Sequence, residues 1–363
     1  MISQELKEVC NMPDWSASMQ QTFEYYTVDP GTWKDDKKIN TVISSTIDRD
    51  SELETLGSAS LNVTDLIGEC YVRIYLITIQ NGITEKFPLA TVLVQTPSLD
   101  YNGKTRKVTM DGYTSLLELK EKLPPLGYSI LKKQNIMDIA CRLSQENTRA
   151  PVALITNSTK LEHDFVADPS DTWLSFLTAL IANAKYTYMV DELGRILFSP
   201  IQDTASLQPV WTFDDSNSSI LYSDFNMEHD IFDVPNVVEV VYSNGTNSWY
   251  AKAVNKDPNS PTSTVSRGRE IPYRDTNPSL VGNTTQAEVN EYAERILKEA
   301  STLEYTIQYS HGYCPVRVGD CVRINHSRFG LNGIKAKVVS QKIDCRPGCK
   351  VTEKAVFTTN LWR

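Results

Sequence analysis

The sequence predicts an α+β fold that is mainly β. It consists of two related antiparallel β-barrels, an α+β unit between them, and a helix-bearing insertion in the second barrel. Three observations support this prediction. Segments rich in β-branched residues, separated by turn residues, fill residues 39–111 and recur after residue 302. Helical patterns gather within residues 115–200, and one short string of residues occurs in both strand-rich regions.

The composition is that of an ordinary globular protein of 363 residues, which is enough for about two to three domains. Hydrophobic residues make up 40% and charged residues 22%, and these shares exclude collagen-like, coiled-coil and wholly disordered chains. The net charge of −9 argues against sequence-independent nucleic-acid binding, because phosphate affinity comes from lysine and arginine. It still allows a surface past which nucleic acid slides.

The sequence shows neither a membrane span nor a secretory signal. No run reaches the ~18 apolar residues that a span requires, so we expect no stable membrane insertion. The first ten residues, MISQELKEVC, lack a basic stretch followed by an apolar core. The 7 cysteines are scattered, which favours reduced thiols that act as small apolar residues in a protein made in a cytoplasm.

The first barrel is expected over residues 37–114. Residues 1–36 form a lead segment before it, with a short helix at 4–10 followed by loop. Hairpin signals at Asn81-Gly82 and Asn102-Gly103 separate strands of this barrel. The expected strands are Ile39–Ile47, Ser58–Val63, Cys70–Ile79, Leu89–Val94 and Lys107–Met110.

Residues 115–205 are expected to form the α+β unit. A first helix stops before Pro124, because proline cannot continue a helix, and a second helix covers residues 130–145. A third helix begins at Asp168 as its N-cap, and its apolar stripe is too wide for a surface helix, so we expect it to be buried. A hairpin within residues 186–198 completes the unit.

The second barrel is expected over residues 206–245 and 303–363, with residues 246–302 inserted into it. The insertion combines a strand, an irregular stretch rich in proline and serine, and a helix. That helix opens with a capping box of Thr285 and Glu288. The strands expected in the barrel are Val237–Tyr242, Tyr305–Tyr309, Asp320–Ile324, Ile334–Ile343 and Val351–Thr358.

The internal repeat is the most informative feature. Ile67–Ile74 (IGECYVRI) resembles Val318–Ile324 (VGDCVRI) when one inserted residue is allowed. Each string follows a short strand and leads into another, and its glycine–acid step suits a tight turn before a strand. Chance agreement between two short strings is the alternative explanation.

Two histidines lie in the same local string, Glu162-His163-Asp164 and Glu228-His229-Asp230, while His311 and His326 stand elsewhere. A metal or acid–base role is one interpretation of the two strings. In a strand, however, both carboxylates would share one face and the imidazole would point to the other. Ordinary polar strand positions are therefore the favoured interpretation.

Cys345 and Cys349 have a spacing compatible with a zinc knuckle, for which Cys314 and Cys321 would be the mates. Cys314 and Cys321 would be ~23 Å apart in an extended chain, so a plain hairpin that carries the two thiols is the favoured interpretation of Cys345 and Cys349. Metal binding and a local disulfide stay open as alternatives. Phosphate-binding glycine loops and the GxSxG and HExxH motifs are absent. We assign no catalytic, cofactor-binding or metal residue and expect no enzyme.

With this order of parts, the sequence resembles the baseplate hub, or tail hub, proteins of long-tailed bacteriophages, whose fold also forms the N-terminal part of tail-associated lysins. The resemblance covers nearly the whole chain from Ile39 onward. The matching stretches are ISSTIDRDSELETLGSASLNVTD (43–65), IGECYVRIYLI (67–77), DPSDTWLSFLTALIANAKYTYMVDELGRILFSP (168–200), DVPNVVEVVYSN (233–244), DPNSPTSTVSRGREIP (257–272) and CPVRVGDCVRI (314–324).

The resemblance implies a homotrimer in which each subunit gives two tail-tube-like barrels, so that three subunits form a pseudo-sixfold ring. The ring would join the sixfold tail tube, or a distal tail protein, above to a threefold spike, fibre or tape-measure protein below. It would continue the DNA channel without specific binding, which the acidic balance favours. The protein would belong to the virion tail tip or baseplate and assemble in the bacterial host cytoplasm.

Because the last expected barrel strand ends close to Arg363, we expect no peptidoglycan-cleaving domain and a structural hub rather than a tail-associated lysin. Two other classes stay open. A carbohydrate- or cell-wall-binding β module would show an exposed aromatic cluster and a monomeric state. A hydrolase with carboxylates that leave no local motif would turn over peptidoglycan.

Overall fold

The protein is mainly β, and most neighbouring strands pair antiparallel. The computed structural model describes residues 13–360, apart from residues 102, 105, 203, 217–218, 230–233, 244–246, 277, 279 and 281–283. Two compact units divide the chain: Met1–Asp224 with Tyr309–Lys354, and Phe225–Gln308 with Ala355–Arg363. No helix in the described part combines the length and the apolar character needed to cross a bilayer.

Five strands make up what we call the first repeat, and the sequence predicted all five. They are β3 (Val42–Asp50), β4 (Gly57–Val63), β5 (Cys70–Gln80), β6 (Ile83–Tyr101) and β7 (Arg106–Tyr113). They pair antiparallel in the order β3-β4-β7-β6-β5. Asn81 and Gly82 have φ of 53° and 79°, the left-handed values that a two-residue hairpin between β5 and β6 requires.

Two further strands extend this sheet, β1 (Gln20–Asp29) and β2 (Lys34–Ile39). β1 pairs along β5 from Gln20↔Ile79 to Val28↔Tyr71, and its Tyr25 and Val28 side chains are buried. The expectation of loop before residue 37 is therefore wrong, because these aromatic and β-branched residues gain a partner in β5. The helix expected at residues 4–10 lies outside the described residues.

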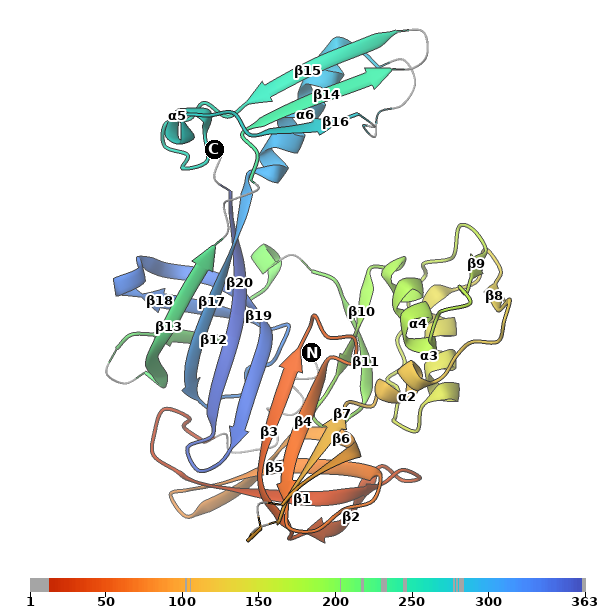
Figure 1. Cartoon of the computed structure of the whole chain (residues 1–363), viewed down its shortest axis with the longest axis vertical. Helices are drawn as coiled ribbons and strands as arrows, with labels where there is room; N and C mark the ends of the chain where they lie inside the picture. Colours follow the sequence, from red (N-terminus) through yellow and green to blue (C-terminus); the bar gives the residue numbers. More distant parts are fainter. Residues whose placement is uncertain are drawn as a thin grey trace. The chain divides into compact units, whose positions relative to one another are not determined.

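The α+β region contains three helices and two short antiparallel strand pairs (Figure 1). Its elements are α2 (Leu117–Glu121), β8 (Ser129–Ile130), α3 (Ile136–Asn147), β9 (Phe165–Val166), α4 (Trp173–Ala182), β10 (Tyr186–Val190) and β11 (Ile196–Pro200). α4 is buried as expected, but its N-cap is Thr172, which forms a capping box with Ser175. Asp168 instead accepts hydrogen bonds from the backbone N–H and hydroxyl of Ser170, so it closes a turn before the helix.

A second repeat has the same connectivity as the first. Its strands are β13 (Leu221–His229), β17 (Thr302–Gly312), β18 (Cys321–His326), β19 (Leu331–Cys345) and β20 (Lys350–Asn360). They are ordered β13-β17-β20-β19-β18, so in both repeats the first, second, fifth, fourth and third strands along the chain lie side by side. This shared order supports a true repeat. β12 (Trp211–Asp214) adds to β18 in parallel, and a 3-10 turn, η1 (Thr204–Ser206), precedes it.

The two repeats are hydrogen-bonded into one 13-stranded sheet, because β19 pairs with both β18 and β3. The repeated strings occupy the same place in each repeat, at the start of β5 and of β18. Gly319 has a φ of 94°, as expected for a tight turn, whereas Gly68 does not adopt a positive φ. A second 3-10 turn, η2 (Ser327–Phe329), connects β18 to β19.

The second compact unit contains a three-stranded sheet and a long helix. Its elements are β14 (Val237–Ser243), β15 (Ser248–Val254), α5 (Thr264–Arg267), β16 (Pro272–Asp275) and α6 (Gln286–Ala300). α6 opens with the expected capping box of Thr285 and Glu288 and buries Val289 and Leu297 against the sheet. β14 pairs with β15 and β16, so the strand expected at Val237–Tyr242 does not join the second repeat.

Candidate functional site: the junction of the two repeats

The junction between the repeats begins with the pairing of two strands. β3 and β19 run antiparallel, with Ser45 opposite Cys345 and Asp50 opposite Ser340. Ile47 and Ile343 face each other in this pairing and are 2% and 1% exposed. The joint is therefore part of the hydrophobic core and holds the two repeats edge to edge.

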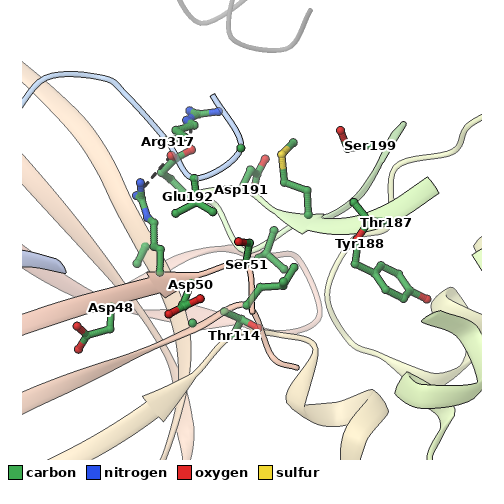
Figure 2. A pocket seen from close by; sticks show the side chains of 18 of the residues that line it. Asp48, Asp50, Ser51, Thr114, Thr187, Tyr188, Asp191, Glu192, Ser199 and Arg317 are labelled. Atoms are coloured by element: carbon green, nitrogen blue, oxygen red, sulfur yellow. Dashed lines mark ion pairs between the residues drawn. The ribbon is translucent and has the colours of Figure 1, made fainter. Parts of the chain in front are cut away.

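A buried acidic side chain ties the α+β region to this joint. Glu192, in the turn between β10 and β11, is 8% exposed. Its Oε1 lies 3.4 Å from Nη2 of Arg49 on β3, and its Oε2 lies 2.5 Å from Nη2 of Arg317, just before β18. Figure 2 shows Glu192 beside Arg317 with these ion pairs dashed. One carboxylate thus bridges arginines from both repeats.

The polar contacts continue into the core of the second repeat. Arg49 Nη1 donates to Oε1 of Gln341 at 3.1 Å, and Gln341 Nε2 donates to Glu353. The Glu353 side chain is fully buried on β20 and also accepts a hydrogen bond of 2.6 Å from the hydroxyl of Tyr309. A buried carboxylate is stable only when its oxygens are bonded in this way. Burial and the neighbouring Glu353 charge both raise the pKa of Tyr309, so that hydroxyl stays a donor.

His311 lies next to the same carboxylate. Its Nε2 is 3.3 Å from Glu353 Oε1, without the geometry of a hydrogen bond, and its Nδ1 lies 2.6 Å from the carbonyl oxygen of Gly312. His311 is completely buried, and its ring packs 4.6 Å from that of Phe213 on β12. The arrangement brings side chains from β17, β19 and β20 into one polar cluster, and Phe213 of β12 packs against it.

A second set of contacts holds the same turn to the first repeat. Arg73 on β5 is 4% exposed and donates to Thr91 Oγ1 and to Asp35 Oδ1, each at 2.9 Å. Thr91 Oγ1 in turn donates to the carbonyl oxygen of Glu192 at 3.0 Å. The indole of Trp33 donates to the carbonyl oxygen of Leu193 at 2.7 Å. The β10–β11 turn is therefore fixed to both repeats at once.

A cavity of about 220 Å³ opens beside this turn. Side chains from β3, β6 and β10 line it, with the start of the second repeated string at Val318 and Gly319 (Figure 2). Its acidic residues include Asp48, Asp50 and Glu192, and of these Glu192 is paired with two arginines. Among the described residues, no group of three histidine, cysteine or acidic side chains could hold a metal ion.

The first of the two histidine strings noted in the sequence contributes no side chain to the contacts of this junction. Glu162-His163-Asp164 occupies a bend and its end rather than a strand, and Asp164 accepts a hydrogen bond from the backbone N–H of Lys132 at 2.8 Å. Glu228 lies on β13, whereas Asp230 and the His229 side chain fall outside the described residues. The argument from strand alternation therefore does not apply to the first string.

Cys345 and Cys349 flank the β19–β20 turn as two free, buried thiols. The backbone N–H of Cys349 donates to the carbonyl oxygen of Arg346 at 2.8 Å, which closes the turn. Burial raises the pKa of Cys345 to about 12 and raises that of Cys349 as well. Cys314 and Cys321 are also free and buried, so all four thiols have the character of small apolar side chains.

The residues of the polar junction were not predicted from the sequence. Strand alternation was an available signal for one of them, because Glu353 stands between Val351 and Ala355 on the buried face of β20. Arg73 also interrupts an apolar run, CYVRIYLI, that is otherwise typical of a buried strand. Arg49, Glu192 and Arg317 are far apart in the chain and have no such local signal.

Comparisons with known proteins rest on structure alone. No family model matches the sequence, and no curated protein sequence matches it either. A tail protein from Neisseria meningitidis MC58 is similar with a TM-score of 0.61 at 15% identity, covering 94% of this chain and 98% of that one. The 43 kDa tail protein of prophage MuSo2 from Shewanella oneidensis gives 0.60 at 12% identity, covering 92% and 98%.

A chain of the Francisella PdpA–VgrG complex is similar as well, with a TM-score of 0.53 at 9% identity. The match covers 98% of this chain and 54% of that one, so the common part is a portion of a longer protein there. In both tail proteins, by contrast, the match covers almost the entire chain. The chain therefore has the fold of these tail proteins, extending over nearly its whole length.

Proposed function

We propose that this protein is a structural component of a phage tail tip or baseplate, a hub in which three copies form a ring around a channel. The observation that carries the proposal is the edge-to-edge joint of two repeats with one connectivity. A chain that holds two equivalent modules side by side can supply six modules from three copies. Such a ring matches sixfold symmetry on one side and threefold symmetry on the other.

In this role the protein would connect the tail tube, or a distal tail protein, to a central spike, fibre or tape-measure protein. It would be part of the virion and would be assembled in the cytoplasm of the bacterial host. Its similarity in fold to two tail proteins over nearly the full chain supports this placement. The net charge of −9 suits a channel along which DNA moves without being bound.

The proposal assigns no catalytic residue. Glu192 and Glu353, the buried carboxylates of the junction, are bonded to arginine, glutamine and tyrosine side chains. These contacts fix the relative position of the strands, which is the task of a structural protein. Turnover of peptidoglycan by the purified chain, lost on replacing one acidic residue, would contradict this view.

The mass of the protein in solution tests the proposal. We expect light scattering to give three times the chain mass of 40.9 kDa, with ring-shaped particles in electron micrographs. A monomer that persists at high concentration, and that neither a tube nor a spike partner assembles, would contradict the hub. That result would favour a monomeric wall-binding module.

A further inference from the structure

The fully buried carboxylate of Glu353 has two hydrogen-bond donors that carry no charge. They are the hydroxyl of Tyr309 and the side-chain amide of Gln341. Arg49 donates to the amide oxygen of Gln341 at 3.1 Å. A charge inside a protein is strongly unfavourable unless an opposite charge is paired with it. Among the described residues, His311 is the one basic side chain at ion-pair distance from this carboxylate.

The two ring nitrogens of His311 both face acceptors. Nδ1 lies 2.6 Å from the carbonyl oxygen of Gly312, and because a carbonyl oxygen can only accept, Nδ1 carries a hydrogen. In a neutral imidazole, Nε2 would then present a lone pair. Nε2 lies 3.3 Å from Oε1 of Glu353, and it has no hydrogen-bond partner among the described residues. Two buried lone pairs that face each other repel, and a second hydrogen on the ring removes this conflict.

The other side chains that pack around the ring of His311 are neutral. β12 contributes Phe213, with ring centroids 4.6 Å apart, and β17 contributes Tyr309 at 5.9 Å. The thiol of Cys314 lies 3.8 Å from Nδ1. Burial raises the pKa of Cys314 and of Tyr309 well above their ordinary values, so both groups stay protonated. Of the titratable groups that face the ring in the described part of the chain, Glu353 is therefore the charged one.

We infer that His311 is an imidazolium cation paired with the carboxylate of Glu353, so that the second repeat takes up one proton when it folds. The proton belongs to the ring rather than to Glu353, because the donors Tyr309 and Gln341 stabilise the ionised carboxylate. In an unfolded chain an ordinary histidine is about one-tenth protonated at pH 7.5. Folding at this pH therefore binds about 0.9 of a proton at His311.

The pair makes the second repeat sensitive to pH, and proton linkage gives the direction. The folded state keeps a proton that the unfolded state releases as the pH rises through about 6.5. The stabilisation is therefore complete below that pH and falls above it. Each further pH unit raises the unfolding equilibrium constant by up to about tenfold, until the folded state loses the proton as well. Cys345 has an ordinary pKa of 9.0, so its effect begins at a higher pH and can be separated.

Proton uptake on refolding tests the inference directly. The unfolded protein is diluted from urea into weakly buffered solution at pH 7.5, and a pH-stat counts the protons that each chain binds. Wild type should bind about 0.9 of a proton per chain more than His311→Gln. His163→Gln is the matched control, because His163 is exposed, and it should bind as many protons as wild type. Equal uptake by wild type and His311→Gln would overturn the inference.

Nuclear magnetic resonance of the wild-type protein gives a readout that does not depend on a variant that folds. With nitrogen-15 in the rings of its 4 histidines, one histidine should have both nitrogens protonated at pH 8, where ordinary histidines are neutral. Glu353→Gln keeps the shape and removes the charge, so it should return that ring to the neutral form. A neutral His311 in wild type would overturn the inference, whether Cys314 donates to Nδ1 or Glu353 holds the proton.

Unfolding in urea at pH 6, 7, 8 and 8.5 measures the consequence for stability. Above pH 7 the unfolding equilibrium constant of wild type should rise by up to about tenfold per pH unit, and in His311→Gln this rise should be absent. His163→Gln should follow wild type. Equal pH dependence of wild type and His311→Gln would overturn the inference. None of these measurements depends on the number of chains in the particle, so that failure would leave the proposed hub intact.

Discussion

The two repeats share one connectivity, but their cores and their edges differ. In the first repeat, β1 and β2 continue the sheet beyond β5. In the second, β12 runs parallel to β18, and no further strand follows in the described part of the chain. The first repeat connects its first two strands by a short turn, whereas β14, β15, β16 and α6 lie between β13 and β17 along the chain. The two repeats thus share their strand order and differ in the strands and segments that are added to it.

The buried side chains of the two repeats differ as well. The first repeat is filled mostly by apolar side chains, among them Val72, Ile74 and Leu76 of β5. The second buries Glu353, Tyr309 and Gln341 in one hydrogen-bonded cluster, with His311 beside it. A polar cluster fixes geometry more strictly than apolar packing does, because each donor has one well-placed acceptor. This difference implies that the second repeat is more sensitive to the loss of a single polar group.

Glu353→Ala should have the largest effect and would break the polar cluster. It removes the acceptor of the Tyr309 hydroxyl bond and one of the two acceptors of the Gln341 amide, which also donates to the carbonyl oxygen of Val316, at a cost of about 1–3 kcal/mol for each buried donor affected. We expect the free energy of unfolding, measured with urea, to fall by about 3 kcal/mol or more. Lys354→Ala, the exposed neighbour on β20, is the control. Equal stability of the two variants would contradict this account of the cluster.

Arg73→Ala and Arg323→Ala compare equivalent positions of the repeated string. Arg73 is buried and bonded to Thr91 and Asp35, whereas Arg323 is exposed. Loss of Arg73 should lower the free energy of unfolding by about 2–3 kcal/mol, because Asp35 loses its ion-pair partner, although it keeps the hydrogen bond from Tyr75, and the β10–β11 turn loses the hydrogen bond from Arg73 to Leu193. Loss of Arg323 should change it little. Urea titration measures the free energy of unfolding of both variants. A larger loss of stability in Arg323→Ala than in Arg73→Ala would contradict the structural role given to Arg73.

High pH should destabilise the folded protein through the buried thiols of the second repeat. Burial raises the pKa of Cys345 from its ordinary 9.0 to about 12, so the unfolded chain loses this proton at a lower pH than the folded one. The free energy of unfolding should therefore fall as pH rises from 9 toward 12, by up to about 1.4 kcal/mol per pH unit for this group. Cys345→Ala should remove that share of the slope. An unchanged slope in unfolding titrations at pH 8, 9 and 10 would speak against it.

The smallest effect should appear in thiol labelling, with no change in stability. Cys70 and Cys321 begin the repeated strands, but Cys70 is half-buried and Cys321 is 2% exposed. A thiol reagent should therefore modify Cys70 before Cys321 in the folded protein, as peptide mapping by mass spectrometry would show. In urea the two rates should become similar. Faster labelling of Cys321 in the folded state would contradict the burial of β18.

All strands of the two repeats except β13, which contains no β-branched residue, were predictable because turn residues and β-branched runs mark them locally. β2 was not, because its sequence, Lys34–Ile39, is charged at nearly every position and takes its strand form from pairing with β1. The start of α4 was misplaced because both Asp168 and Thr172 are good caps, and the choice depends on Ser175 completing the capping box. Local signals thus found the elements but not every boundary.

The junction was predictable only in part. The burial of Glu353 follows from the alternation of β20, which a closer reading of the sequence would show. The bridge that Glu192 makes to Arg49 and Arg317 depends on three segments brought together by the sheet order. No pattern within a window of sequence contains that information. The repeat itself was visible in one short string, yet its full extent appears only in the strand connectivity.

A reconstruction of the assembled particle by electron microscopy tests the central claim most directly. We expect a threefold ring in which six equivalent strand modules surround an opening, joined alternately within and between chains. The joints between chains should superpose on the β19–β3 joint inside the chain. A closed twofold dimer, or a threefold particle without six equivalent strand modules around an opening, would contradict the account.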